Sequence, residues 1–201
     1  MDIDELISIV TLKKLEDNKF EGQNYKTVWG RIFGGQVLSQ SLHAAYQTVP
    51  ENRIAHSMHA YFILPGDLNE PVIYEVDNIR NGGSFTTRRI VAFQKGRAIF
   101  NMAASFQKDE EGFDHQIQMP NVLSPDLLLT DFEQAEKFKE ELAERYQIFL
   151  AAHPKVFDFK PVGTNIFLRK ENALPINHCW FRLKDKIDMP LQFHHQLLAF
   201  V

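Results

Sequence analysis

The sequence is poor in cysteine, in long apolar runs and in terminal signals, and each shortage narrows what the protein can be. Cys179 is the only cysteine among 201 residues, so the chain can form no internal disulfide, as is usual in a reducing compartment. No run of about 18 apolar residues exists, so we predict no membrane-spanning helix. Residues 1–5 are acidic and lack a signal-peptide pattern. We expect a cytoplasmic protein, or a peroxisomal one if the source is eukaryotic.

The sequence also lacks a surplus of basic residues. Lysine and arginine number 22 against 26 aspartate and glutamate, which gives a net charge of -4 and predicts no nucleic-acid partner. The hydrophobic share of 44% is that of a globular protein, and 201 residues make one large domain or two small ones. Phenylalanine occurs 17 times against 5 tyrosines and 2 tryptophans, so we expect a phenylalanine-rich core.

One glycine-opened segment, residues 34–49, predicts a buried helix around which the rest is organised. Apolar or small residues recur on it in two neighbouring stripes, Leu38, Leu42, Ala45 and Val49 beside Val37, Ser41 and Ala44. Gly34 and Gly35 allow backbone to approach closely and leave amide N–H groups available to an acceptor. Pro50 and Asn52 end the segment.

Strand-like segments surround this helix in sequence. They are residues 19–22, 54–64, 72–80 and 85–94, followed by a strand on which Ala98, Phe100, Met102, Ala104 and Phe106 share one face. Tight turns at Asn81-Gly82-Gly83 and Lys95-Gly96 join the later strands. This order predicts an α+β fold of the hotdog type, an antiparallel sheet wrapped round a central helix, over residues 19–108.

We expect four parts along the chain. Residues 1–18 form an N-terminal helix, with helical spacing over 3–15, and residues 19–108 form the first hotdog domain. Residues 109–155 are a linker with an amphipathic helix of about 20 residues that begins near Phe132. Residues 156–201 begin a second hotdog domain, with strands at 156–168 and 179–183 and a helix opened by Pro190. Two strands and one helix can bury only a little apolar surface among themselves. We therefore expect that the rest of this domain is missing from the chain.

No catalytic constellation is visible in the residues alone. His56 and His59 lie three apart in a strand, which predicts opposite faces and no shared metal ion. His194 and His195 diverge on a helix in the same way. Residues 82–85 lack the second glycine and the strand–turn–helix setting of a nucleophile elbow. We therefore predict no metal site and assign no catalytic residue in this chain.

Four residues are candidates for substrate binding. His59 and Tyr61 share a strand face and are predicted to line a pocket beside the helix, with a buried core histidine as the alternative. Arg88 and Arg89 occupy opposite faces of their strand. Either arginine can pair with a phosphate of a nucleotide-bearing ligand, with an ordinary surface or interface arginine as the alternative.

Several sequence blocks occur in a specific order and spacing: Phe20-Glu21-Gly22-Gln23, Arg31-Ile32-Phe33-Gly34-Gly35-Gln36-Val37, His56-Ser57-Met58-His59-Ala60-Tyr61-Phe62-Ile63-Leu64-Pro65-Gly66-Asp67, Ile73-Tyr74-Glu75-Val76, Gly83-Ser84-Phe85-Thr86-Thr87-Arg88-Arg89 and Ala103-Ala104-Ser105-Phe106-Gln107. Together they resemble the medium-to-long-chain acyl-CoA thioesterase II family, the double-hotdog thioesterases. The resemblance covers residues 20–120 and, more loosely, 192–201, which resembles the start of the family's second hotdog helix.

The resemblance implies hydrolysis of acyl-CoA to free acid and CoA, without a metal or organic cofactor, in a homo-oligomer. In the family an Asp, a Ser or Thr and a Gln activate a water molecule that attacks the thioester carbonyl. The Asp is expected about two positions past Val201, and none of the three matches a residue of this sequence. His43 is the counterpart of that Asp in the first helix.

Two other functions stay open at this point. A non-catalytic acyl-CoA-binding or protein-interaction module is the alternative that the unmatched catalytic residues suggest. A hotdog enoyl-CoA hydratase would carry Asp and His five positions apart. Asp188 and His194 are six apart, which argues against that enzyme.

Overall fold

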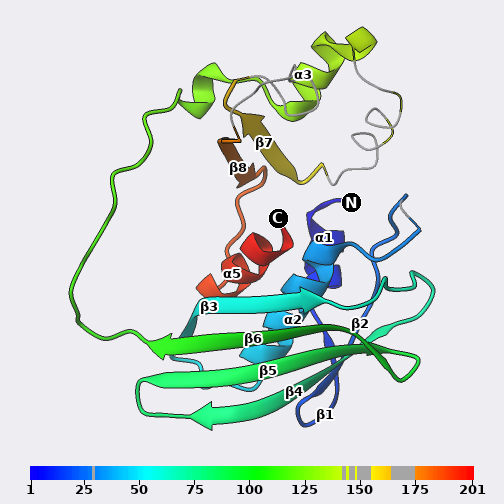
Figure 1. The fold of residues 1–201 in the computed structure, drawn as a ribbon, viewed down its shortest axis with the longest axis vertical. Helices are drawn as coiled ribbons and strands as arrows, with labels where there is room; N and C mark the ends of the chain where they lie inside the picture. Colours follow the sequence, from blue (N-terminus) through cyan, green and yellow to red (C-terminus); the bar gives the residue numbers. More distant parts are fainter. Residues whose placement is uncertain (29, 142–143, 145–147, 149–154, 164–174) are drawn as a thin grey trace. The chain divides into compact units, whose positions relative to one another are not determined.

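The computed structural model describes residues 1–28, 30–141, 144, 148, 155–163 and 175–201 of the chain (Figure 1). These residues form two compact units, each of which we describe by itself. One unit contains residues 4–112 and 188–201, and the other contains residues 1–3 and 113–187. The predicted sheet and central helix both belong to the first unit.

A six-stranded antiparallel sheet makes up most of the first unit, and its strand order is β1-β2-β4-β5-β6-β3. The strands are β1 (Lys13–Glu16), β2 (Lys19–Gly22), β3 (Arg53–Phe62), β4 (Val72–Asn81), β5 (Phe85–Gln94) and β6 (Arg97–Lys108). Every predicted strand of residues 19–108 is present, and the α+β prediction is confirmed.

Local turn chemistry fixes where these strands reverse. Lys95 and Gly96 have φ angles of 49° and 72°, the pair of positive values that a type I′ hairpin turn requires between β5 and β6. At the other hairpin, the Gly82 N–H donates to the Phe85 carbonyl over 2.8 Å. The turns that the sequence predicts therefore set the pairing register of β4, β5 and β6.

Helix α2 (Gly34–Tyr46) packs against one face of this sheet (Figure 1). The core between them contains mostly residues that alternate along the strands: Phe20, Tyr74, Val76, Ile90, Ala92, Phe100, Met102, Ala104 and Phe106. The helix ends three residues before the predicted position 49. The N–H groups of Thr48 and Val49 bond to carbonyls three residues back, at 3.0 and 3.5 Å, so the last residues form turns instead.

Two buried glutamines tie α2 to its neighbours. Gln36 and Gln40 have no exposed surface. The Tyr74 hydroxyl donates to Gln40 Oε1 at 2.6 Å, and Gln40 Nε2 donates to the Ile9 carbonyl at 2.6 Å and the Gln23 carbonyl at 2.9 Å. Gln36 Nε2 also donates to the Gln23 carbonyl, at 3.1 Å. These bonds satisfy amide groups that would otherwise be buried unpaired.

The N-terminal helix is shorter than predicted. Helix α1 covers Ile3–Val10 rather than residues 3–15, and residues 13–16 form β1. β1 pairs with β2 so that Lys13 faces Glu21 and Glu16 faces Lys19. Opposite charges across a strand pair favour the hairpin, and Asn18 has the positive φ of 62° that its turn needs.

Helix α5 (Leu191–Phe200) packs against α2 and begins after Pro190, as predicted. The contact is closest at Gly35. A Cβ atom at this position would collide with the Phe200 carbonyl oxygen and would lie 2.8 Å from the Phe200 carbonyl carbon. The Phe33 and Phe200 rings meet edge to face at 5.2 Å between centroids. The two helices can approach this closely only because residue 35 has no side chain.

The second unit has its own regular elements in the residues that the structure describes. They are the short 3-10 helices η1 (Pro125–Leu127) and η2 (Lys139–Glu141), helix α3 (Asp131–Lys137) and the antiparallel strands β7 (Phe157–Pro161) and β8 (Cys179–Leu183). A capping box of Thr130 and Glu133 begins α3. Most of the predicted helix beyond residue 141, and the predicted strand residues 164–168, lie outside the described residues.

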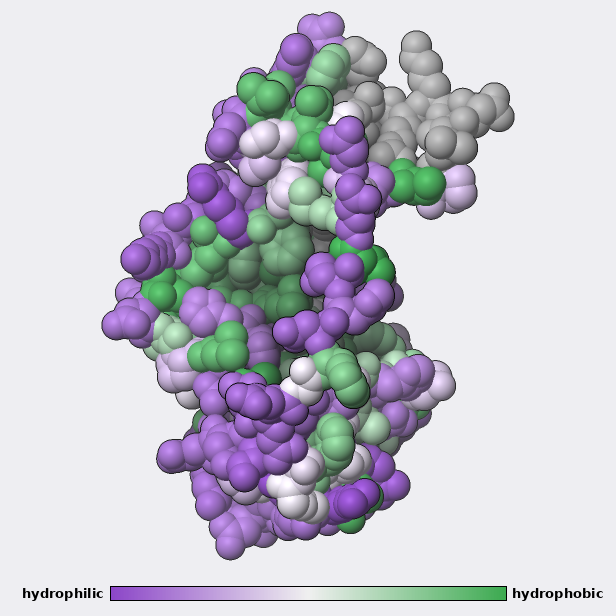
Figure 2. Space-filling model, turned by 90° about the vertical axis from the view of Figure 1, so that its left-hand side faces the viewer, coloured by the Kyte–Doolittle hydropathy of each residue, from purple (hydrophilic) through white to green (hydrophobic). Residues whose placement is uncertain are grey.

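The surface carries large apolar side chains among its charged ones. Figure 2 shows one face of the molecule, on which hydrophobic residues stand in patches between hydrophilic residues. The exposed apolar residues of the first unit include Met58, Tyr61, Phe62, Ile63, Ile79 and Phe85. No helix among the described residues is long and apolar enough to cross a membrane.

We predict that Gly35→Ala weakens the contact between α2 and α5, since the added methyl group meets backbone that cannot rotate away. The expected loss is roughly 1–3 kcal/mol in the free energy of unfolding, measured by urea denaturation. Gly34→Ala is the matched control, because its methyl group meets only the ring of Phe62 at 3.0 Å. Equal losses for the two variants would contradict the packing described here.

Candidate functional site

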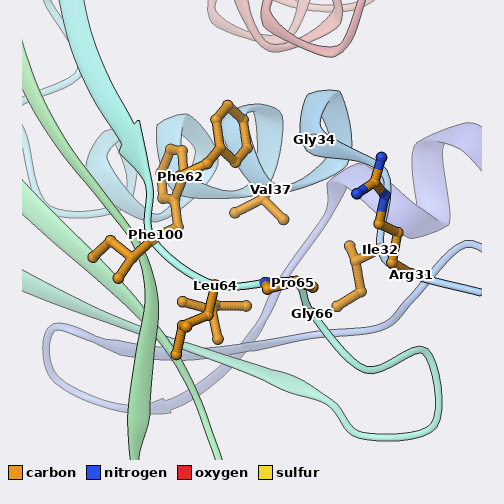
Figure 3. A pocket seen from close by; sticks show the side chains of 11 residues that line it. Arg31, Ile32, Gly34, Val37, Phe62, Leu64, Pro65, Gly66 and Phe100 are labelled. Atoms are coloured by element: carbon orange, nitrogen blue, oxygen red, sulfur yellow. The ribbon is translucent and has the colours of Figure 1, made fainter.

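A pocket of about 420 Å³ opens at the start of α2, between this helix, the end of β3 and the loop that follows β3 (Figure 3). Its lining is mainly apolar: Ile32, Val37, Phe62, Ile63, Leu64, Pro65, Ile99 and Phe100, with Gly34 and Gly66. Among the described residues of the lining, Arg31 is the one with a charge, and it lies at the exposed edge. The pocket therefore suits an apolar chain that has a polar or anionic group at one end.

The first turn of α2 borders this pocket without a side-chain cap. The N-cap residue Phe33 is extended (φ -69°, ψ 130°), and its side chain cannot accept a hydrogen bond from the helix. The first N–H groups of an α-helix have no partner within the helix, and the helix dipole adds partial positive charge there. Gly34 has no side chain of its own to cover this backbone. A carbonyl or carboxylate oxygen in the pocket is thus favoured beside this helix start.

The side-chain amides of Gln94 and Asn24 hold the loop of residues 65–70, and the start of this loop forms one wall of the pocket. Gln94 accepts from the Asp67 N–H at 2.8 Å and donates back to the Asp67 carbonyl at 2.9 Å. Gln94 and Asn24 both donate to the Glu70 carbonyl, at 2.6 and 2.5 Å. Five backbone and side-chain groups are thereby fixed in one geometry, so hydrogen bonds within the chain hold this wall in place.

Asp67 closes the same loop as a turn former, which is the role its Pro-Gly-Asp setting predicts. Its carboxylate accepts from the Asn69 N–H at 3.0 Å and from Lys95 Nζ at 3.0 Å. These partners, the Asn69 N–H foremost, lower the pKa of the Asp67 carboxyl. The carboxylate is occupied with the turn and does not line the pocket.

Polar side chains also meet where α2 packs on α5. His43 Nδ1 lies 3.2 Å from Gln196 Oε1, and Tyr46 Oη lies 2.8 Å from His195 Nδ1 while it accepts from the Ala55 N–H at 2.9 Å. Burial lowers the pKa values of both histidines, against a smaller opposite effect of Gln196 on His43. Burial also raises the pKa of Tyr46. At neutral pH this interface therefore consists of uncharged hydrogen-bonding groups.

His59 and Tyr61 share a strand face, as predicted, and their rings lie 4.9 Å apart. That face is the one α2 does not cover. Opposed residues of paired strands lie on one face, and His59 and Tyr61 oppose Ala103 and Asn101, whereas the core residues of β6 alternate with these two. The two side chains are therefore not in the pocket beside the helix. A contact between them and a substrate stays a prediction.

Arg88 is almost completely buried, with 1% of its surface exposed. Its Nε donates to Thr48 Oγ1 at 2.8 Å, and Nη2 donates to the Thr48 carbonyl and to Asn81 Oδ1, both at 2.7 Å. Nη1 donates to the Arg80 and Thr87 carbonyls at 3.0 Å. All five N–H groups are used within the chain, so the guanidinium joins the end of α2 to β4 and β5.

Arg89 points to the opposite face from Arg88, as the strand pattern predicts. Its Nη2 lies 3.3 Å from Asp77 Oδ2, and both side chains are more than half exposed. His59 and Arg89 both oppose Ala103 from the two sides, so they lie in one row across the uncovered sheet face. Binding of a phosphate by Arg89 remains a prediction.

The predicted separation of His56 and His59 onto opposite faces is wrong. A β-bulge between Ala55 and Ser57 adds a residue to β3 and turns His56 to the uncovered face, where its Nε2 lies 2.8 Å from Ser105 Oγ. In the part of the chain that the structure describes, no three His, Cys, Asp or Glu side chains are grouped to hold a metal ion.

The strand patterns did not identify the apolar walls of the pocket. Phe62, Ile99 and Phe100 occur in segments where both sheet faces carry large residues, so alternation alone does not separate pocket from core. Two local sequence signals indicate where the pocket lies. Gly34 and Gly35 open the helix, and the turn at Pro65 and Gly66 follows the strand that lies beside it.

A family model described as "Acyl-CoA thioesterase N-terminal domain" matches residues 25–107. Acyl-CoA thioesterase 2 of Haemophilus influenzae is 33% identical over 198 residues, which cover 98% of this chain and 69% of that protein. Human acyl-coenzyme A thioesterase 8 is 32% identical over 201 residues, which cover 96% of this chain and 63% of that protein. This chain therefore spans only part of the length of these relatives.

Solved structures agree with the sequence matches. An acyl-CoA thioesterase II, TesB2, from Mycobacterium marinum is 33% identical and superposes with a TM-score of 0.73 over 96% of this chain and 66% of that one. A protein with a hot dog fold from Alicyclobacillus acidocaldarius reaches a TM-score of 0.71 at 17% identity, over 98% of this chain and 69% of that one. The predicted hotdog fold is confirmed.

We predict that Arg88→Met lowers the free energy of unfolding by roughly 3 kcal/mol or more, because it leaves several buried oxygens without donors. Arg89→Met, next to it in the sequence, removes only an exposed ion pair and should cost at most about 1 kcal/mol. Urea denaturation of the two variants gives the comparison. A mild effect of Arg88→Met would show that its hydrogen bonds are dispensable for folding.

We predict that acid weakens the first unit through His43. Its folded-state pKa is lowered, so below about pH 6.5 the unfolded chain binds a proton that the folded chain does not yet bind, and stability falls with pH. His43→Asn keeps an amide N–H near the position of Nδ1 but cannot titrate, so it should reduce the loss of stability between about pH 7.5 and pH 5. His115→Asn, in an exposed segment, is the control and should leave the loss unchanged.

Proposed function

Because the chain belongs to the acyl-CoA thioesterase family, we propose that the protein hydrolyses medium- to long-chain fatty acyl-CoA to free fatty acid and CoA. The observation that carries this proposal is the apolar pocket that opens at the uncapped start of α2. An acyl chain fits its walls, and a thioester carbonyl fits the free amide groups beside Gly34. Backbone N–H groups held in place at a helix start stabilise the negative charge that develops on the carbonyl oxygen during hydrolysis.

Water is the nucleophile in this proposal, activated by the Asp, Ser or Thr, and Gln that the family resemblance implies. These three match no residue of the chain, so they belong to the additional length that the relatives have. The end of α5 supports this arrangement, since Phe200 packs against Phe33 and Gly35, the two neighbours of the pocket residue Gly34. A general base near the C-terminal end of that helix would face the thioester.

The proposal extends to the setting of the enzyme. We propose that residues 156–201 begin a second hotdog domain, and that the protein acts in fatty acid metabolism as a cytoplasmic homo-oligomer without a cofactor. The sequence features that favour the cytoplasm are the single cysteine and the lack of a signal-peptide pattern. The homo-oligomer and the absence of a cofactor rest on the family resemblance alone.

The alternative is an acyl-CoA-binding or protein-interaction module without catalysis. It follows from the same pocket combined with the unmatched catalytic residues. Binding of a non-hydrolysable thioether analogue of acyl-CoA, without release of CoA from the thioester by a protein of the relatives' full length, would favour this alternative.

We predict that a protein that carries this chain together with the remaining length of its relatives releases CoA from medium- and long-chain acyl-CoA. Val37→Phe fills the pocket and should lower kcat/KM at least about tenfold, because overpacking excludes the acyl chain. Thiol release at several chain lengths gives the rates. The present chain alone should show little activity.

Ile79→Phe is the control, since Ile79 is 54% exposed on β4 and does not line the pocket. Its kcat/KM should equal that of the unchanged protein. Circular dichroism checks that both variants fold. Absence of CoA release at every chain length would contradict the thioesterase proposal. Equal rates for Val37→Phe and Ile79→Phe would show that the acyl chain does not bind in this pocket.

A further inference from the structure

We propose that Phe62 is the specificity-determining residue of the pocket, and that its ring selects straight-chain acyl groups over groups branched next to the thioester. The inference rests on the proposed function, since it takes the acyl group to lie in the pocket with its carbonyl at the start of α2. The inference concerns the width of the pocket next to the thioester carbonyl.

Phe62 is the last residue of β3, and it pairs in register with Phe100 on β6. Their ring centroids lie 5.1 Å apart. Phe100 is 1% exposed and fixed in the core, whereas Phe62 is 60% exposed although it lines the pocket. One ring is therefore part of the rigid wall, and the other lies at the opening with solvent on one side.

The ring of Phe62 also touches the start of α2. A Cβ atom built on Gly34 would lie 3.0 Å from Cζ and 3.1 Å from Cε1 of Phe62, so the ring lies directly on the Gly34 backbone. It thereby spans from β3 to the helix at the pocket opening, where Figure 3 shows Gly34, Val37 and Phe62 together. The position of the ring therefore sets how wide the pocket opening is on the side of the helix.

This position lies beside the proposed site of the thioester carbonyl. The acyl carbons next to the carbonyl must then pass along the ring of Phe62. A straight chain needs the width of one methylene group, whereas a methyl branch at carbon 2 competes with the ring for space. Because packing at close contact tolerates little added volume, the branched group is disfavoured.

Gly34→Ala provides an independent probe of the same contact. Gly34 has helical backbone, so alanine is tolerated there and keeps the N–H group, and among the described residues the nearest side chain to its methyl group is Phe62. Any effect of this substitution on ligand selectivity should act through the ring. In a Phe62→Ala background the effect should vanish.

The test measures binding of thioether analogues of acyl-CoA, straight or 2-methyl-branched with equal carbon number, by this chain and by Phe62→Ala, Gly34→Ala and the double variant. The unchanged chain should prefer the straight analogue about tenfold, and Phe62→Ala should bring the ratio close to one. Gly34→Ala should change the ratio at least about fourfold, the effect of one buried methylene group, but only while Phe62 is present.

Phe85→Ala is the matched control, because Phe85 is 48% exposed and packs on His56, away from the pocket. It should leave the ratio unchanged, and circular dichroism checks the fold of every variant. An unchanged ratio in Phe62→Ala, or an effect of Gly34→Ala that persists without Phe62, overturns the inference. If the chain binds with the expected ratios but the longer protein releases no CoA, the inference about Phe62 stands and the proposal of hydrolysis is contradicted. If no analogue binds to this chain, the inference about Phe62 fails, whereas CoA release by the longer protein decides the proposed function.

Discussion

Burial of α2 is the constraint on which the rest of the first unit depends. A helix enclosed between a sheet and a second helix must find partners within the protein for its polar side chains, because an unpaired buried amide costs about 1–3 kcal/mol. Gln36 and Gln40 have such partners in Tyr74 and in backbone carbonyls of residues 9 and 23. The same hydrogen bonds that satisfy the helix thus fix the end of α1 and the chain that leads to the pocket.

Much of the fold could be predicted because its signals are local. Alternating residues and turn glycines identify β4, β5 and β6, since each strand needs only its own pattern and its own turn. The prediction of a helix over residues 11–16 was wrong for the opposite reason. The side chains of this segment fit a helix by spacing, but their charges pair with β2, and that pairing depends on a partner strand rather than on periodicity.

The positions of the candidate site residues could be predicted less well from sequence, because they depend on tertiary structure. A strand pattern shows that His59 and Tyr61 share a face, but it does not show which face the helix covers. The bulge before Ser57 also reverses the side on which His56 lies, and no residue in that stretch marks it. Arg88 appeared equivalent to Arg89 in sequence. Only the position of Thr48 at the end of α2 makes one arginine structural and leaves the other exposed.

The two ends of α2 differ in a way that accounts for the place of the pocket. In the turn that follows the C-terminal end, the Thr48 N–H bonds to the Ala45 carbonyl and the buried cation of Arg88 bonds to the Thr48 carbonyl, and the helix dipole favours positive charge near this end. At the N-terminal end Phe33 supplies no cap, and Gly34 adds no side chain of its own beside the amides. The chain therefore satisfies one end of its central helix with its own residues. The other end, bordered by an apolar pocket, keeps the capacity to bind an oxygen atom of a ligand.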